Sequence, residues 1–386
     1  MNFRKMNAWL MAVSLTATTV GVNGMPLYVD AAQLGMKREV NEETLRENGL
    51  QISTEAKKYD VDEKGKITKY YGTEQEVIIP KKKNGRQICE IGQGVFQNQQ
   101  TIQSVVVSEG ITQISQDAFF NCKALKTVIV ASTVTELERG AFQNCDSLEE
   151  IDLSRTAITK ISEGVFKNCK NLKKVILPQG LLTIEADAFK GCGHLADINL
   201  NNLERLDKIG SGAFGNCISL TNVVLPDSVT RISNGAFGYC TGLQEITIPA
   251  RVTEFGQAVL SGVSEVTIKG TLHSLAYDYA VEKNIAFESI SEEILVSNIE
   301  LSGADITLDE ENIKKLDIKE GAEIQVNVKV SSDATDQSIS WECNKEGIVE
   351  ISKDGVIKGL KKGFTTVVVS AVGGVNKTDY MEINVI

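Results

Sequence analysis

A motif that recurs about every 23 residues constrains the fold of this chain more than any other feature. Cysteines stand at positions 122, 145, 169, 192, 217 and 240, at spacings of 23, 24, 23, 25 and 23 residues. Each closes the same motif, A/V-F-x-x-C, which we call the Phe-Cys motif. VFQNQ at 95–99 is an earlier copy with Gln99 in the cysteine position, and AVLSG at 258–262 is a degenerate last copy. Repetition at this period indicates a solenoid whose copies stack on one another.

The residues between the cysteines predict how one copy folds. After each motif comes L-x-x-V-x-L, as at 172–177 and 220–225, often followed by proline. V-x-L is a strand of three to five residues, too short to be stable alone, so we expect the copies to stack in parallel at about 4.8 Å. Their inward Val, Ile and Leu side chains would form one core. Along its opposite side we expect a column of phenylalanines: Phe96, Phe119, Phe142, Phe166, Phe189, Phe214 and Phe237.

Six cysteines at one repeat position would form a column rather than a metal site. Zinc sites use cysteine pairs two to four residues apart with a second pair nearby, and this chain has no such pairs. We interpret the column as buried thiols that act as small apolar core residues. Export into an oxidising medium would favour disulfides between neighbouring copies instead, which is the alternative. No metal and no cofactor is predicted.

The repeating unit A-F-x-x-C-x-x-L-x-x-V-x-L-P-x-x-V-x-x-I resembles the BspA-type bacterial leucine-rich repeat. Residues 62–80 are similar to the short hairpin before the family's first strand, and residues 275–287 are similar to its closing helix and final strand. The resemblance implies a leucine-rich-repeat solenoid with terminal caps over residues 61–290 and a parallel β-sheet on its concave face. An insertion around residues 201–207 departs from the family pattern.

From about residue 294 the Phe-Cys motif disappears and alternating strands of another kind begin. Short β-rich runs separated by turn residues, one of them containing Trp341, predict an antiparallel β-sandwich. The runs from Ser340 to Thr365 resemble the bacterial immunoglobulin-like group 2 domain. This resemblance implies an all-β immunoglobulin-like sandwich over residues 294–386, with Trp341 in its core.

The start of the chain has the pattern of an export signal. Two basic residues precede an uncharged stretch at 7–23, and Val-Asp-Ala at 29–31 offers the small residues that a signal peptidase recognises. The pattern predicts a signal peptide over residues 1–31 and a linker over residues 32–60. We therefore expect a bacterial protein that is secreted or associated with the cell surface, without a transmembrane segment in the mature chain. An uncleaved N-terminal anchor is the alternative.

Charge and composition argue against several classes of function. The formal net charge of −11 has the wrong sign for nucleic-acid binding, which needs clustered Lys and Arg. Histidine occurs only at positions 194 and 273, so general acid–base chemistry near neutral pH has few candidates. Phosphate-loop, dinucleotide-binding and zinc-protease motifs are absent from the sequence. We expect no enzyme activity and no catalytic residues.

The outward residues of the V-x-L strands are the candidate binding site. One column is mostly apolar, and the column beside it is mostly polar or acidic. Such stripes on a curved sheet fit a protein with basic and hydrophobic features, although β-branched residues are also favoured in strands for structural reasons alone. The candidate binding residues are Val106, Ile129, Glu150, Asp152, Lys174, Ile176, Asn199, Val224 and Thr247.

The predicted function follows from the family resemblance. It implies an exported, non-catalytic adhesin that binds an extracellular protein of a host matrix, a host cell or another bacterium through the concave face. A glycan-binding or cell-wall-associated scaffold is the alternative. The absence of tryptophan from the repeats argues against that alternative, because sugar-binding platforms usually need exposed aromatic rings.

Overall fold

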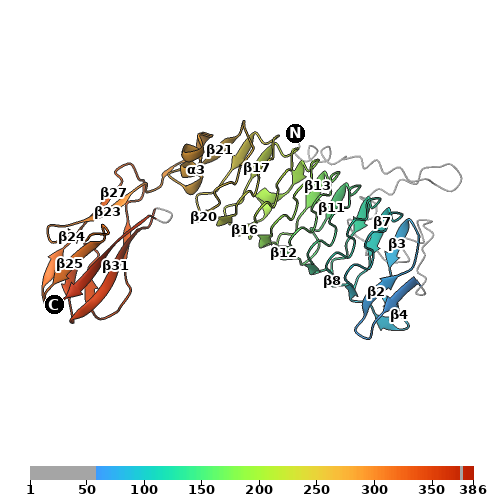
Figure 1. Ribbon diagram of the computed structural model, residues 1–386, viewed down its shortest axis with the longest axis horizontal. Helices are drawn as coiled ribbons and strands as arrows, with labels where there is room; N and C mark the ends of the chain where they lie inside the picture. Colours follow the sequence, from blue (N-terminus) through green and yellow to red (C-terminus); the bar gives the residue numbers. More distant parts are fainter. Residues whose placement is uncertain (1–57, 374–376) are drawn as a thin grey trace, which may run out of the picture.

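The structure, a computed structural model, describes residues 58–373 and 377–386. The predicted signal peptide over 1–31 and nearly all of the predicted linker lie outside the described residues. Stacked coils lead from the N-terminal end, blue at the right of Figure 1, to a separate group of strands, orange and red at the left. Within the described part of the chain, no helix is long and apolar enough to cross a membrane.

One side of the stack is the parallel ladder predicted from V-x-L, which we call the first ladder. Neighbouring strands pair in register, so that Val105 lies beside Val128 and Val223 beside Ile246. The ladder has two sections. The first contains β3 (Glu76–Ile79), β7 (Ser104–Val107), β9 (Thr127–Ile129), β11 (Glu150–Asp152), β13 (Lys174–Ile176) and β15 (Asp197–Ile198); the second contains β17 (Asn222–Val224), β19 (Glu245–Thr247), β21 (Thr267–Leu272) and β22 (Ala286–Ile294).

Another side of the stack is a second parallel ladder, which the sequence analysis did not predict. It comes from the V-x-x-I segment before each Phe-Cys motif, whose last residue is buried, as Ile184 and Ile232 are. Strands of two residues form only because the coils stack, so no local signal marks them. The strands are β2 (Lys66–Tyr70), β6 (Glu90–Ile91), β8 (Gln113–Ile114) and β10 (Glu136–Leu137), then β12 (Lys160–Ile161), β14 (Thr183–Ile184), β16 (Lys208–Ile209), β18 (Arg231–Ile232) and β20 (Glu254–Phe255).

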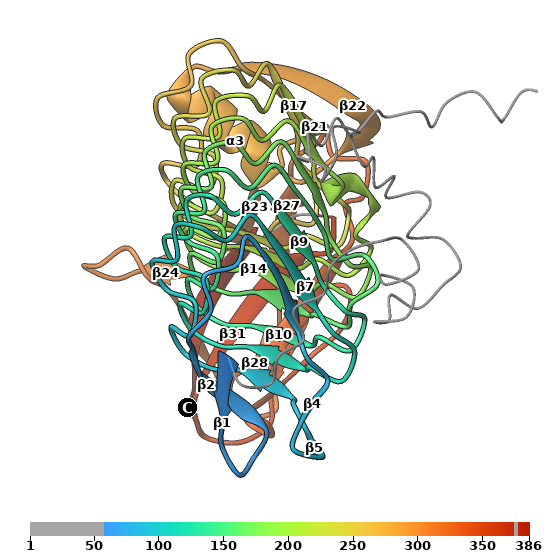
Figure 2. The same ribbon diagram turned by 90° about the vertical axis from the view of Figure 1, so that its right-hand side faces the viewer.

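Both ends of the stack are capped as the family resemblance implies. At the N-terminal end, β1 (Tyr59–Val61) pairs antiparallel with β2, and the hairpin of β4 (Lys82–Lys83) and β5 (Arg86–Gln87) faces the viewer in Figure 2. At the other end, α3 (Leu275–Lys283) packs on the last coils and precedes the final strand, β22. The N-cap Ser274 starts this helix by accepting a hydrogen bond from a backbone N–H of the first turn.

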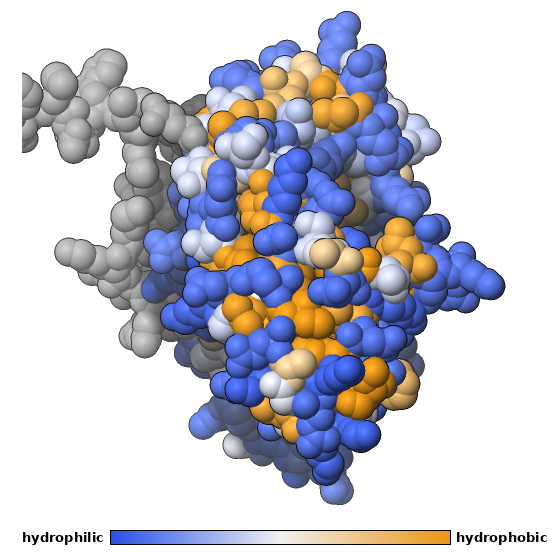
Figure 3. Space-filling view, turned by 90° about the vertical axis from the view of Figure 1, so that its left-hand side faces the viewer, coloured by the Kyte–Doolittle hydropathy of each residue, from blue (hydrophilic) through white to orange (hydrophobic). Residues whose placement is uncertain are grey.

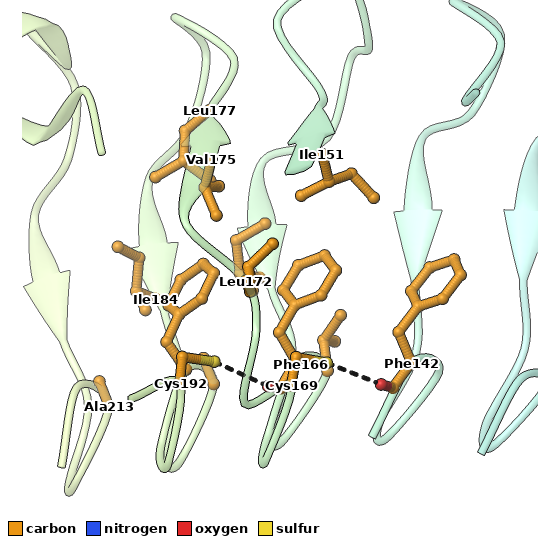
Figure 4. Packing of buried hydrophobic residues seen from close by; sticks show 14 of the residues in the cluster. Phe142, Ile151, Phe166, Cys169, Leu172, Val175, Leu177, Ile184, Cys192 and Ala213 are labelled. Carbon is orange, nitrogen blue, oxygen red and sulfur yellow. Dashed lines mark hydrogen bonds between the residues drawn. The ribbon is translucent and has the colours of Figure 1, made fainter. Parts of the chain in front are cut away.

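Each coil turns at a tight corner that carries the Phe-Cys motif. The buried phenylalanine rings stack from coil to coil, with centroids 4.8 to 5.7 Å apart and planes within 12° of parallel (Figure 4). This confirms the predicted phenylalanine column. The residue before the cysteine has a left-handed backbone, with φ of 61° at Asn144 and 60° at Asn168. Asparagine tolerates that conformation better than most residues, which explains why the motif so often reads Asn-Cys.

Every cysteine of the column donates its S–H to the carbonyl oxygen of a phenylalanine one coil earlier. The six sulfur–oxygen distances are 3.0 to 3.2 Å, and two of these bonds are drawn in Figure 4, from Cys169 and Cys192. All six thiols are buried and free, as the interpretation of core thiols predicts. The first copy has no phenylalanine motif before it, and there Gln99 replaces the cysteine.

The strands after residue 294 enclose a second core, separate from that of the stack. Trp341 packs against this core and is partly exposed. Of the pairings among these strands, only that of β25 with β32 is parallel. The immunoglobulin-like assignment stays a prediction. The strands are β23 (Ile299–Ser302), β24 (Thr307–Leu308), β25 (Lys314–Ile318), β26 (Glu323–Gln325), β27 (Asn327–Val330), β28 (Ile339–Cys343), β29 (Val349–Ile351), β30 (Val356–Gly359), β31 (Gly363–Ala371) and β32 (Thr378–Val385).

Candidate functional site

The nine predicted binding residues lie along the outer side of the first ladder, which we call the first-ladder face. Asp152 and Val224 are exposed, with 42% of Val224 accessible. Val106 is buried, at 9% accessible. The other predicted residues are half-buried: Ile129, Glu150, Lys174, Ile176, Asn199 and Thr247.

The strand register brings some of these residues together and separates others. Asp152 lies opposite Ile176 in the first section of the ladder, and Val224 lies opposite Thr247 in the second. Asn199 lies just after β15, outside any strand, and β15 does not pair with β17. The single apolar stripe expected from the sequence is therefore two shorter stripes with a break between them.

Asn199 has a structural role at this break. Its Oδ1 accepts a hydrogen bond from the Leu177 N–H at 2.8 Å, and its Nδ2 donates one to the Leu177 carbonyl at 3.1 Å. The amide thus replaces the strand backbone that would otherwise pair with the end of β13. A side chain held in this way has less freedom to bind a partner than the sequence pattern predicts.

Ion pairs between neighbouring strands neutralise part of the polar column. Lys174 Nζ lies 3.3 Å from Asp197 Oδ2, and Lys269 Nζ lies 3.1 Å from Glu245 Oε1. The hydrogen bond to Glu245 raises the pKa of Lys269. Such exposed pairs stabilise the fold by less than about 1 kcal/mol each. On the surface, each pair places a lysine beside a carboxylate of the column, which lowers the local negative charge.

Among the coils from β7 to β20, two differ in length from the others, and each interrupts one ladder. Regular coils have nine residue steps between the core residue of the first-ladder strand and that of the second, as from Val223 to Ile232. The coil of β11 and β12 has ten steps, and β12 does not pair with β10. The coil of β15 and β16 has eleven, and its extra length forms the short 3-10 helix η2 (Leu200–Asn202). There the first ladder is interrupted while β14, β16 and β18 stay paired.

A pocket lies at each interruption. The first-ladder pocket has a volume of about 180 Å³ and is lined by Ile198, Leu200, Asn201, Asn222, Val223 and Val224. The second-ladder pocket has a volume of about 430 Å³ and is lined by Gln116, Glu136, Glu138, Arg139, Lys160, Ser162, Glu163, Glu185 and Ala186. The sequence analysis missed both pockets. Their only signal was the pair of irregular cysteine spacings, 24 and 25 residues.

Most charged groups of the second-ladder pocket are engaged within the protein. Arg139 Nη2 lies 3.1 Å from Glu163 Oε1, and Lys208, a neighbour of the pocket, lies 3.4 Å from Glu185. Glu138 accepts a hydrogen bond from the backbone N–H of Gln116 at 2.7 Å. These contacts bind the walls of the pocket to one another.

The two histidines lie apart and make structural contacts. His194 Nδ1 lies 2.8 Å from the carbonyl oxygen of Lys170, and His273 Nε2 lies 3.0 Å from Asp333 Oδ2 beyond the last coil. The contact with His273 lowers the pKa of Asp333. Within residues 58–373 and 377–386, no group of three or more His, Cys, Asp or Glu side chains is arranged to hold a metal ion.

The part of the chain after residue 294 carries apolar side chains on its surface. Figure 3 shows this end of the molecule, with hydrophobic residues in orange gathered among hydrophilic ones in blue. The most exposed is Phe364, at 65% accessible. This is a second candidate surface, which the sequence analysis did not select. Its exposed large apolar residues are Leu308, Leu360, Phe364, Val372, Tyr380 and Ile386.

Comparison with known families identifies the repeat. Residues 89–208 and 207–324 match the sequence model of a family described as the BspA type leucine rich repeat region, in six copies. Together the two matched ranges cover more than half of the chain. They include the Phe-Cys motifs at 118–122 through 236–240.

Several solved structures are similar to parts of the chain. A leucine-rich repeat protein of T. pallidum is 24% identical, with a TM-score of 0.40, over 60% of this chain and 94% of that one. A leucine-rich repeat protein of Eubacterium ventriosum is also 24% identical, with a TM-score of 0.42, over 48% of this chain and 51% of that one.

One characterised protein matches a short stretch of the sequence. It is a 3-O-alpha-D-galactosyl-alpha-L-arabinofuranosidase of Bifidobacterium longum, 26% identical over 91 residues. The match spans 23% of this chain and only 8% of the enzyme's own length. A match to so small a part of an enzyme does not transfer its activity.

Proposed function

Because this chain belongs to the BspA-type leucine-rich repeat family, we propose that it is an exported adhesin that binds another protein without catalysis. The family points to a binding or scaffold role. The observation that carries the proposal is the first-ladder face. Its strands hold partly exposed side chains in fixed register on a continuous core, which is how solenoids present an extended binding surface.

The chemistry of the face favours a protein partner with apolar and basic groups. Ile129 and Ile176 are half-buried and Val224 is exposed, next to carboxylates such as Glu150 and Asp197. Aromatic side chains, which often dominate the energy of protein interfaces, are absent from the predicted binding residues. We therefore expect modest affinity for a single site, strengthened when several copies bind at once.

The remaining parts of the chain have supporting roles in this proposal. Residues 1–31 direct export to the cell surface or the medium and are then removed. The strands after residue 294 form an immunoglobulin-like domain that accompanies the solenoid. The partner is an extracellular protein of a host matrix, a host cell or another bacterium.

A glycan-binding or wall-associated scaffold is the second candidate. The partial match to a glycoside hydrolase is the observation that favours it. Binding to a glycan array that free sugar competes away would support this candidate. Binding to matrix proteins that free sugar leaves unchanged would support the adhesin.

The experiment that tests the adhesin measures binding to immobilised extracellular-matrix proteins, bacterial cells and glycans. The variant Ile129→Asp/Ile176→Asp places two charges on the first-ladder face, and we expect it to lose protein or cell binding. Its control, Leu308→Asp/Phe364→Asp, alters the second candidate surface and should bind normally. The reverse result would move the binding site to the strands after residue 294. A protein that binds nothing in the panel would contradict the adhesin.

A further inference from the structure

The interruption of the first ladder creates a local chemistry that the regular coils do not have. We infer that the first-ladder pocket anchors one aliphatic side chain of an extended polypeptide segment of the partner. The inference rests on the proposed function and deepens it, because it assigns an anchor point and the chemical class of the group that enters. It follows from the two walls of the pocket and from its lining.

On the edge opposite β19, the strand β17 has no partner strand. In the coil before, the N–H groups of Ala196 and Asp197 both donate to the Lys173 carbonyl, each at 3.1 Å. The corresponding N–H groups of Thr221 and Asn222 make no such bond among the described residues, because β15 and β17 are not paired. The edge of β17 therefore faces the pocket with free backbone hydrogen-bonding groups.

The coil on the opposite side satisfies part of its backbone within the chain itself. Asn199 binds both backbone groups of Leu177, as described above, and the Leu200 carbonyl accepts the N–H of Leu203 at 3.1 Å. The exposed amide side chains of Asn201 and Asn222 make no hydrogen bond within the described part of the chain. The edge of β17 and the two amides at the rim thus offer free donors and acceptors at the pocket.

These free groups match an extended peptide backbone. A peptide that lies along an unpaired strand edge supplies alternating N–H and C=O groups, and its side chains enter pockets beside the strand. Primary amides such as those of Asn201 and Asn222 both donate and accept, so they can bind either backbone group. A polypeptide segment is therefore the occupant that satisfies the edge of β17.

The lining selects an uncharged side chain. Four of the six lining residues are apolar, and none is ionisable. A charged group would lose its hydration there without gaining a partner of opposite charge. A volume of about 180 Å³ admits one side chain of aliphatic size. Val224, accessible at 42%, is the most exposed apolar residue of the nine predicted ones and forms part of the lining.

The test titrates the full chain with the blocked peptide acetyl-Ser-Leu-Ser-amide and follows the Val and Leu methyl signals by NMR. We expect the Val224 and Leu200 signals to shift saturably. Acetyl-Ser-Asp-Ser-amide should bind at least about tenfold more weakly, a difference of about 1.4 kcal/mol. Val224→Asp should abolish the shifts of Leu200. Val281→Asp is the matched control, since it makes the same change at a position that is 63% exposed on α3 and does not line the pocket, and it should leave the shifts unchanged.

Two results would overturn the inference: equal binding of the two peptides, and shifts that persist in Val224→Asp. A second variant tests the geometry, because deletion of Asn201 and Asn202 restores a regular connection of nine steps and should remove leucyl-peptide binding. If that deletion does not fold, the comparison of Val224→Asp with Val281→Asp decides alone.

The outcome is distinguishable from that of the proposed function. Partner binding that is lost in Ile129→Asp/Ile176→Asp, together with no peptide binding at the pocket, would keep the adhesin and overturn the anchor. Peptide binding at the pocket, together with no protein partner in the panel, would keep the anchor and contradict the adhesin.

Discussion

The corners of the solenoid and the connections between its two ladders respond differently to a change in coil length. A corner runs from a second-ladder strand through the Phe-Cys motif to the next first-ladder strand. From β6 to β19, the core residues of these two strands are always fourteen residue steps apart. From β7 to β20, the connection from a first-ladder strand to the next second-ladder strand spans nine, ten or eleven steps. Every irregular cysteine spacing therefore originates in the connection, and the corner never changes.

Packing explains the difference. A corner contains a stacked ring, a thiol bonded to the previous coil and a residue in left-handed conformation, so one extra residue would misplace all three. Phe142 and Phe166 remain stacked at 5.7 Å across the ten-step connection, and Phe189 and Phe214 at 5.3 Å across the eleven-step one. The corners hold the stack together, and the connections are where the surface varies.

The largest expected effect comes from truncating the corner core. Phe189 is fully buried between two stacked rings, so Phe189→Ala should lower the free energy of unfolding by about 3–5 kcal/mol. Denaturant unfolding measures the change. Phe364→Ala, at a position 65% exposed, is the control and should change stability by less than about 1 kcal/mol. A loss under 1 kcal/mol at Phe189 would mean that the column does not carry the stability of the stack.

Insertions test the comparison directly. One glycine inserted after Asn168 lengthens a corner and separates Phe166 from Cys169, so we expect a loss of about 3 kcal/mol from disrupted stacking and an unmade thiol bond. One glycine inserted after Gln179 lengthens a connection from nine to ten steps, a length that already occurs in this chain. The free energy of unfolding should then fall by only about 1 kcal/mol. Urea unfolding of the two variants gives both values. Equal losses would remove the distinction between corner and connection.

Much of the corner could be predicted from the sequence, because it repeats. The alignment of phenylalanines and cysteines in successive copies indicated two buried columns, and both are present. The second ladder could not be predicted in this way. Its strands have two residues each, as in β14, and they exist only through pairing with neighbouring coils, which no local pattern encodes.

The candidate site was less predictable than the fold. The V-x-L alternation assigned Ile129 and Val224 to the first ladder, but it gave no sign that the ladder stops after β15. Asn199 looked like another outward residue, although its amide binds the backbone of Leu177. Pockets arise where coils fail to pair, so the irregular spacings of 24 and 25 residues were more informative than the repeat itself.

The buried thiols predict a pH dependence that belongs to the corners. Burial raises the pKa of Cys122 and of Cys240 to about 12 and raises the pKa of Cys192 well above its ordinary value. In the unfolded chain thiols ionise above about pH 8.5, while the folded chain keeps them protonated. Their contribution to stability is therefore complete below that pH and is lost as the pH rises towards the folded pKa.

Cys192→Ala removes one such thiol. As the pH rises from about 8.5 to about 10, the free energy of unfolding should fall by about 1.5 kcal/mol less in the variant than in the original chain. Urea unfolding in the presence of a reductant measures both changes. Val175→Ala is the control, because it removes a buried side chain that does not ionise and should lower stability equally at both pH values. Parallel pH profiles for Cys192→Ala and the original chain would show that this thiol is accessible to solvent.

The smallest expected effect concerns the corner in which a bulky residue, in place of asparagine, precedes the cysteine. Tyr239 occupies the left-handed position before Cys240, with φ of 59°, where Asn216 stands one coil earlier with the same φ. A bulky residue is strained in this conformation, so Tyr239→Asn should relieve strain. Part of that gain is offset because the ring of Tyr239 lies over Gly262.

We expect Tyr239→Asn to raise the free energy of unfolding by about 0.5 kcal/mol and the reverse change, Asn216→Tyr, to lower it by about 1 kcal/mol. Thermal and urea unfolding of both variants would measure these shifts. Because 57% of Tyr239 is exposed, its replacement removes little core packing. If both substitutions lowered stability, contact between Tyr239 and Gly262 would outweigh backbone strain. The sign at Tyr239 therefore decides whether the backbone conformation or the local contact selects the residue before each cysteine.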